Sequence, residues 1–173
     1  MEAPDARYGL GLEAGVNRLV EYNPLWPRAF AKEAERIQAL SDLVLDIEHI
    51  GSTSVPGLRA KPIIDLQLGV ADIDHGLLFI QPMARLGYDY AGSQGIADHH
   101  IFGRGAARTH LVHVVVFESD QWRRTLRFRD RLRAEPQLRA EYQALKVALT
   151  DQSPDRAAYT AGKTAFVQRA SAE

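Results

Sequence analysis

The residues best suited to chemistry lie between positions 49 and 68, where two apolar runs flank a short polar turn. The turn contains Gly51, Ser52 and Ser54, and the second run carries one carboxylate, Asp65, among isoleucine and leucine residues. Glycine lets a ligand approach the backbone closely, and N–H and hydroxyl groups can hold phosphate oxygens. A carboxylate in an apolar strand costs free energy unless it has a partner, and Mg²⁺ prefers oxygen ligands. The pattern therefore predicts a phosphate site in which Asp65 is a Mg²⁺ ligand or a general base.

Two neighbours of Asp65 bear on this interpretation. The carboxylate could instead pair with a nearby base such as Lys61, which we also consider a candidate phosphate-binding residue. Gln67 lies two residues along the strand and therefore on the same face as Asp65. A neutral amide is a weaker ligand than a carboxylate, so Gln67 counts against a site with two metal ions.

Histidines supply a second set of candidates. In a regular strand His110 and His113 point to opposite faces, and His113 is the better partner for Asp65 because it lies inside the apolar strand. His49 directly precedes the turn and is expected to point at the same place. Asp65 and His113 are therefore the candidate catalytic residues and metal ligands, and His49 is a candidate substrate-binding residue. The alternative is that these histidines are hydrogen-bonded core residues.

Basic residues near the C-terminus follow helical spacing. Arg123 begins a series of arginines spaced four residues apart on one helix face. Such a face is usually solvated, and the alternative is that it contacts a phosphate-rich substrate, so Arg123 is a candidate phosphate-binding residue. Aromatic residues that would stack on bases are sparse there, and nucleic acid is not an expected partner. Tyr142 with Lys146, and Tyr159 with Lys163, are four residues apart. We interpret these pairs as packing, the alternative being that one lysine faces the site.

The hydrophobic pattern predicts the elements that position these residues. Strands are expected at 43–50, 63–70, 87–90, 100–103 and 110–117. Helices are expected at 24–40, 73–86, 119–133, 136–149 and 153–170. The first helix should carry Glu33 on its outer face, and the second should break near Pro82. The chain is expected to be a single α/β (α+β) domain, residues 1–173, with a loose arm at 1–15, a mixed sheet flanked by helices and a mostly helical segment at 119–173.

Composition excludes several kinds of protein. A chain of 173 residues suits one domain with a real core, and a net charge of −1 gives no general attraction to nucleic acid or to anionic membranes. The chain has no cysteine, which excludes disulfides, thiolate zinc sites and cysteine nucleophiles. No apolar stretch approaches the roughly 20 residues that a membrane span needs, and the N-terminus does not have the pattern of a secretory signal. We expect a cytoplasmic protein that does not enter a membrane.

The run His49-Ile-Gly-Ser-Thr-Ser-Val-Pro-Gly-Leu-x-Ala-Lys-Pro-Ile-Ile-Asp65 resembles the signature of the GrpB-like family. The similarity continues in Tyr22-Asn23-Pro24-x-Trp26 and in later segments, and covers most of the chain. Membership implies a nucleotidyltransferase-like fold, in which a Gly-Ser turn follows one strand and a pair of acids lies on the next. The turn then corresponds to Gly51 and Ser52, and the first acid corresponds to Asp65. Gln67 stands at the position of the second acid.

Three hypotheses about function follow. The first is a nucleotidyltransferase-like protein that binds a nucleotide or another phosphorylated small molecule, with Mg²⁺ as cofactor. The second is a non-catalytic binding module that kept the fold without the second metal-binding acid. The third is a metal-dependent hydrolase, which requires Asp65 and His113 to lie within reach of one ion.

Overall fold

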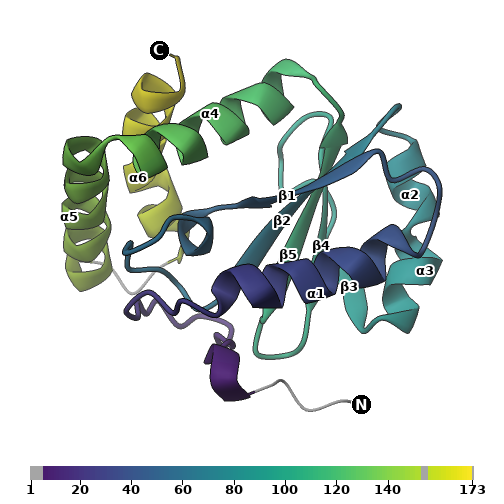
Figure 1. Ribbon diagram of the computed structural model, residues 1–173, viewed down its shortest axis with the longest axis horizontal. Coiled ribbons are helices and arrows are strands. Elements are labelled where there is room, and N and C mark those ends of the chain that lie inside the picture. Colours follow the sequence, from purple (N-terminus) through teal and green to yellow (C-terminus); the bar gives the residue numbers. More distant parts are fainter. Residues whose placement is uncertain (1–5, 153–155, 173) are drawn as a thin grey trace.

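The computed structural model describes residues 6–152 and 156–172, which form a mixed five-stranded sheet with helices on both faces (Figure 1). The strands are β1 (Asp46–Ile50), β2 (Ile64–Val70), β3 (Tyr88–Tyr90), β4 (His100–Arg104) and β5 (His110–Val116). Their spatial order is β1-β2-β5-β4-β3, with β2 and β5 parallel and all other neighbours antiparallel. The predicted α/β (α+β) class, with a mixed sheet flanked by helices, is confirmed.

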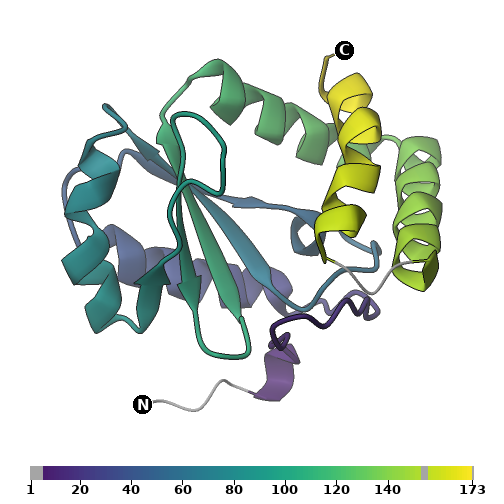
Figure 2. The same ribbon diagram turned by 180° about the vertical axis from the view of Figure 1, so that it is seen from behind.

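Two groups of helices cover the two faces of the sheet. The helices are α1 (Trp26–Gln38), α2 (His75–Leu78), α3 (Ile80–Arg85), α4 (Asp120–Ala134), α5 (Pro136–Gln152) and α6 (Arg156–Ala172). The first three pack on one face, and α4 crosses the other (Figure 1). From behind, α5 and α6 are seen beside the sheet, where they pack against α4 and each other (Figure 2). A short 3₁₀ helix, η2 (Ser52–Ser54), follows β1 in the connection to β2 and lies on the side of the sheet where these helices pack.

Strand alternation sends polar and apolar side chains to different faces. In β2, Leu66 and Leu68 are fully buried in the core shared with α1, together with Val112 of β5. Asp65 and the other odd-numbered residues of β2 therefore face α4. The parallel register of β2 and β5 then places His113 beside Gln67, on the same face as Asp65.

The predicted second helix is two helices. The chain breaks at Phe79, so that Pro82 falls in the first turn of α3 rather than in a helix interior. A proline there costs little because the first N–H groups of a helix have no intrahelical partner. The expected break near Pro82 therefore occurs, three residues earlier than the proline.

The described part of the N-terminal segment packs against the rest of the domain. Leu12 pairs with Arg108 in an isolated β-bridge, and Trp26 Nε1 donates a hydrogen bond of 3.0 Å to the carbonyl oxygen of Tyr8. The expectation of a loose arm is therefore corrected for residues 6–12, and positions 1–5 lie outside the described residues. The predicted helix start at Ser153 also lies outside them, and α6 is described from Arg156. No helix among the described residues has the length and apolar character needed to cross a membrane.

Candidate functional site

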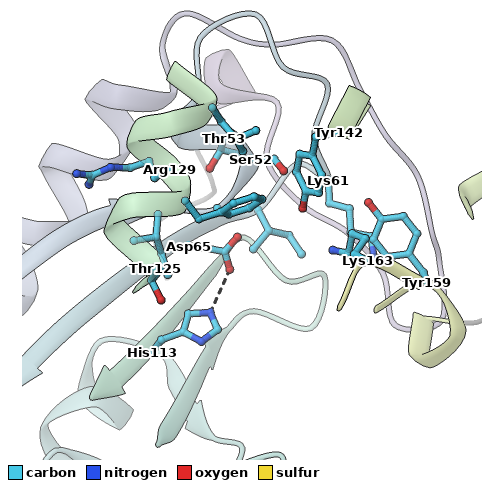
Figure 3. Close-up of a pocket in the computed structure, with 15 residues that line it drawn as sticks. Ser52, Thr53, Lys61, Asp65, His113, Thr125, Arg129, Tyr142, Tyr159 and Lys163 are labelled. Carbon is cyan, nitrogen blue, oxygen red and sulfur yellow. Dashed lines mark hydrogen bonds and ion pairs between the residues drawn. The ribbon is translucent and has the colours of Figure 1, made fainter. Parts of the chain in front are cut away.

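A cavity of about 290 Å³ lies above Asp65, where η2, β2 and β5 meet the three C-terminal helices (Figure 3). Its floor is formed by Asp65 and His113, and its roof by Thr125, Phe128 and other residues of α4. The cavity brings together residues that are far apart in the sequence, because α4 returns over the face of the sheet that carries Asp65. The predicted association of the polar turn with Asp65 is therefore present in the structure.

Gly51 lies against the Asp65 carboxylate. Its φ of +70° and ψ of −176° fall in a region that is almost restricted to glycine. A Cβ atom built at this position would lie 2.6 Å from Asp65 Oδ2. Glycine is thus required both by the backbone conformation and by the approach of the turn to the carboxylate.

Asp65, His113 and His99 form a chain of side chains. Asp65 Oδ1 is 3.3 Å from His113 Nε2, and His113 Nδ1 is 3.1 Å from His99 Nε2. Burial lowers the pKa of His99 to about 4, so this imidazole is neutral near pH 7. Its Nδ1 has no hydrogen-bond partner among the described residues, which fits an Nε2–H that donates to His113. His113 then donates through Nε2 to Asp65, and the chain fixes the orientation of the carboxylate.

Two lysines approach the opposite side of the cavity. Lys61 Nζ lies 4.0 Å from the centre of the Tyr159 ring, and Lys163 Nζ lies 4.3 Å from it. Both lysines line the cavity together with Tyr159. Burial raises the pKa of Tyr159 to about 12, so its phenol stays neutral near pH 7. The face of its ring contacts both lysine cations. Cationic groups therefore face Asp65 across the cavity (Figure 3).

The hydroxyl of Ser52 contacts a lysine of α5 on the side that faces away from the cavity. Lys146 Nζ is 2.9 Å from Ser52 Oγ, and Ser52 itself lines the cavity. Thr53, Thr125 and Arg129 also line it. Arg129 is additionally bound to Glu48 and Asp130, which neutralise much of its charge.

Three predicted site residues lie elsewhere. His49 pairs with Leu66 across β1 and β2, so it faces away from Asp65, and its ring stacks on Phe30. Ser54 donates a 2.5 Å hydrogen bond to the Gly51 carbonyl and lines, with His49, a separate hollow on the other side of the turn. Arg123 has a side chain 61% exposed, is 3.9 Å from Glu118 and does not line the cavity. The expectation that these three residues share the Asp65 site is therefore corrected.

The donor set limits which metal ion could bind. Among the described residues there is no group of three or more histidine, aspartate or glutamate side chains arranged to hold a metal. Gln67 offers little, because its side chain is buried and its amide donates to the Trp122 carbonyl at 3.3 Å. Asp65 therefore fits Mg²⁺ only if the ligand's own phosphate oxygens and water complete the coordination.

Sequence analysis missed several residues that form the cavity. Thr125 carries no recognisable signal, and Arg129 is one of several arginines of this helix that nothing in the sequence singles out, because the positions of both depend on how α4 lies over the sheet. For Tyr159 and Lys163, the spacing of four residues was interpreted as packing, with the alternative that one lysine faces the site. The structure favours that alternative for Lys163.

Comparison with known proteins places the chain among a group of bacterial proteins. The family model described as GrpB protein matches residues 17–173. A crystal structure of the conserved protein GrpB from Enterococcus faecalis is 38% identical, with a TM-score of 0.81 over 90% of this chain and 95% of that one. The glutamate-rich protein GrpB of Alkalihalophilus pseudofirmus is 33% identical over 91% of this chain and 95% of its own length. UPF0157 protein YqkA of Bacillus subtilis is 38% identical over 88% of this chain, which spans only 45% of that longer protein.

Proposed function

The chain belongs to the GrpB family, and we propose that it binds a nucleotide or another phosphorylated small molecule in the cavity above Asp65. The observation that carries this proposal is the placement of Lys61 and Lys163 opposite Asp65, in a cavity that is also lined by Ser52 of the turn. Positive charge is concentrated there although the whole chain has a net charge of −1. A local cationic site of this kind selects anions without attracting nucleic acid in general.

The binding mode follows from the chemistry of these groups. Lys61 and Lys163 donate charge-assisted hydrogen bonds to phosphate oxygens, and Ser52 Oγ lines the same cavity. Asp65 would repel a bare phosphate, so the carboxylate would serve either as a ligand of Mg²⁺ or as a base toward an acceptor hydroxyl. Mg²⁺, when bound, supplies positive charge near the phosphorus. His113 holds the carboxylate in position through the hydrogen bond described above.

The size of the cavity restricts the ligand. At about 290 Å³ it lies at the lower end of the range of roughly 300–1,000 Å³ that is usual for small-molecule sites. This favours the phosphorylated part of a ligand as the portion that is recognised.

The alternative is a binding module without turnover. Its support is Gln67, which replaces the second acid of the related fold and is buried against Trp122 rather than open to the cavity. Binding is common to both alternatives, and transfer of a group is the point on which they differ. The third hypothesis, a metal-dependent hydrolase, requires Asp65 and His113 to lie close together, and they are within hydrogen-bond distance. This hypothesis predicts that Mg²⁺ binds without a nucleotide.

Isothermal titration calorimetry with ATP, in the presence and absence of Mg²⁺, tests the proposal. We expect wild type to bind, and Lys163→Met to weaken binding about tenfold or more, because a hydrogen bond to a charged group contributes roughly 1.5–3 kcal/mol. Asp65→Ala should remove the Mg²⁺-dependent part of the affinity. Lys32→Met, which removes an exposed lysine of α1, is the control for net charge. No binding by wild type, or unchanged binding in Lys163→Met, would contradict the proposal.

A further inference from the structure

A serine hydroxyl and a buried amine meet in the wall of the cavity. Lys146 is 1% exposed, and its Nζ contacts Ser52 Oγ at 2.9 Å and the carbonyl oxygen of Arg59. The same Nζ lies 5.1 Å from the centre of the Tyr142 ring, and the Tyr142 hydroxyl hydrogen-bonds to Ser52. None of these contacts carries a negative charge. A lysine ammonium buried without a carboxylate is costly, so the charged form is disfavoured here.

The surroundings of Lys146 act in the same direction. Burial makes the largest contribution and nearby cations add to it, so that the pKa of Lys146 falls to about 7. The cations come from the loop before β2 and from α6, and they are Arg59, Lys61 and Lys163. The nearby phenols of Tyr142 and Tyr159 have pKa values raised by burial and remain neutral. Near pH 7 a large fraction of molecules therefore carries an uncharged amine next to Ser52.

The hydrogen bonds can be completed with that amine uncharged. As an ammonium, Lys146 donates to Ser52 Oγ and to the Arg59 carbonyl. Once the amine is uncharged, its lone pair can accept from the Ser52 O–H, because that hydroxyl rotates, while a Lys146 N–H still donates to the Arg59 carbonyl. Ser52 and the uncharged Lys146 are then joined by one hydrogen bond in which Ser52 is the donor. In this arrangement the hydroxyl proton of Ser52 points at a base, which is the geometry of an activated nucleophile.

We propose that Ser52 is a nucleophile that accepts a phosphoryl group from the bound ligand, with Lys146 as its general base. The ligand class, a phosphate ester or anhydride, rests on the proposed function. Ser52 Oγ attacks phosphorus and forms a P–O bond, its proton passes to Lys146 Nζ, and the bond from phosphorus to the leaving oxygen breaks. The leaving oxygen takes a proton from a water molecule in the cavity, and the resulting hydroxide attacks the phosphoserine. The bond from phosphorus to Ser52 Oγ then breaks, Lys146 returns its proton to Ser52, and inorganic phosphate is released.

The cavity supplies what this step needs apart from the base. Ser52 lines the cavity while Lys146 lies behind it, so a ligand meets the hydroxyl and not the amine. Lys61 and Lys163 face the same space and offset the negative charge of the transferred group. A purely structural Lys146, which ties α5 to the turn, would leave Ser52 as unreactive as any other serine.

Labelling with an uncharged alkyl fluorophosphonate, followed by peptide mass spectrometry, tests the proposal. The serine oxygen displaces fluoride from phosphorus, so an activated serine acquires a stable adduct. We expect a single adduct on Ser52 of wild type, with a rate that rises with pH through about 7. The exposed Ser93 of the same molecule is the internal control and should stay unlabelled. Lys146→Met should slow labelling about 100-fold or more, the usual contribution of a general base, whereas Lys32→Met should not.

Two outcomes would overturn the inference: no adduct on Ser52, or an unchanged rate in a folded Lys146→Met protein. If Lys146→Met does not fold, the pH profile of wild type decides, because an unassisted serine would show no rise near pH 7. A second reaction with p-nitrophenyl phosphate should release p-nitrophenol and inorganic phosphate with wild type and not with Ser52→Ala, and no release despite fluorophosphonate labelling would overturn phosphoryl transfer. The uncharged probe does not require the phosphate site. Labelling without ATP binding therefore contradicts only the proposed function, and ATP binding without labelling contradicts only this inference.

Discussion

Replacing Gly51 with alanine should destabilise the protein for two separable reasons. The backbone at φ +70° and ψ −176° is almost closed to alanine, which costs about 1–3 kcal/mol. The new Cβ would also lie 2.6 Å from Asp65 Oδ2, so the carboxylate must move away from its hydrogen bond with His113. Both side chains are about a quarter exposed, and losing this contact adds at most about 1 kcal/mol. The expected total is about 1–4 kcal/mol, or a fall in Tm of roughly 2–16 °C at about 2–4 °C per kcal/mol for a chain of this size.

Gly57 provides a matched control for the backbone contribution. It also has a positive φ, +79°, but a Cβ at this position would meet no atom within 4 Å. Gly57→Ala should therefore cost only the backbone strain, about 1–2 kcal/mol. Urea unfolding of both variants measures the difference, and thermal melting gives an independent value.

A double-mutant cycle isolates the contact with Asp65. In an Asp65→Ala background the colliding oxygen is absent, so the cost of Gly51→Ala should fall toward that of Gly57→Ala. A coupling free energy of about 1 kcal/mol is expected, within the range for residues in contact. Equal costs for Gly51→Ala and Gly57→Ala, together with additive effects of Gly51→Ala and Asp65→Ala, would refute the argument that the turn is packed against the carboxylate.

Three further predictions concern other parts of the fold. Burial lowers the pKa of three histidines to about 4, namely His49, His99 and His110. Because the unfolded chain binds these protons below a pH of about 6.5 and the native state does not, stability should fall as the pH drops from there toward 4, by about 1.4 kcal/mol per pH unit for each proton. Urea unfolding at a series of pH values measures this slope, and His110→Phe should reduce it by one proton. Gln67→Asp should destabilise by about 2 kcal/mol or more without creating Mg²⁺ affinity, since the new carboxylate is buried beside the Trp122 carbonyl; unfolding and calorimetry check it against Gln67→Met. Arg129→Ala should cost about 1–3 kcal/mol because it leaves Glu48 without its partner, whereas Arg123→Ala, an exposed change on the same helix, should stay within about 0.5 kcal/mol in the same unfolding assay.

Local sequence patterns were sufficient for most of the elements. The apolar run that ends at Val70 predicted a strand, and two β-rich runs at 100–103 and 110–117 predicted the strands that pair antiparallel as β4 and β5. The opposite directions of His110 and His113 followed from strand alternation alone, and His110 indeed faces the side of Arg104 whereas His113 faces Asp65. These predictions succeeded because hydrophobic period and turn chemistry act over a few residues.

Two predictions were wrong because they depended on contacts between separate elements of the fold. His49 was assigned to the Asp65 site because it adjoins the turn, but the antiparallel register pairs it with Leu66 and so turns it to the other face. That register was not visible before strand pairing was known. Glu33 is predicted on the outer face of its helix, yet it is 2% exposed, and its carboxylate accepts hydrogen bonds from Tyr88 and Arg104. Those partners lie 55 and 71 residues further along the chain.

The sequence by itself determined the mixed α/β fold, the glycine at the turn and the single carboxylate in the apolar strand, because each follows from the conformational preference or burial cost of neighbouring residues. Only the tertiary structure decided which cations face Asp65 and which base lies behind Ser52. Lys163 and Lys146 come from helices about 100 residues beyond the turn, and at that separation their positions depend on how whole elements pack. Packing energy is summed over many weak contacts and leaves no signature in a short stretch of sequence.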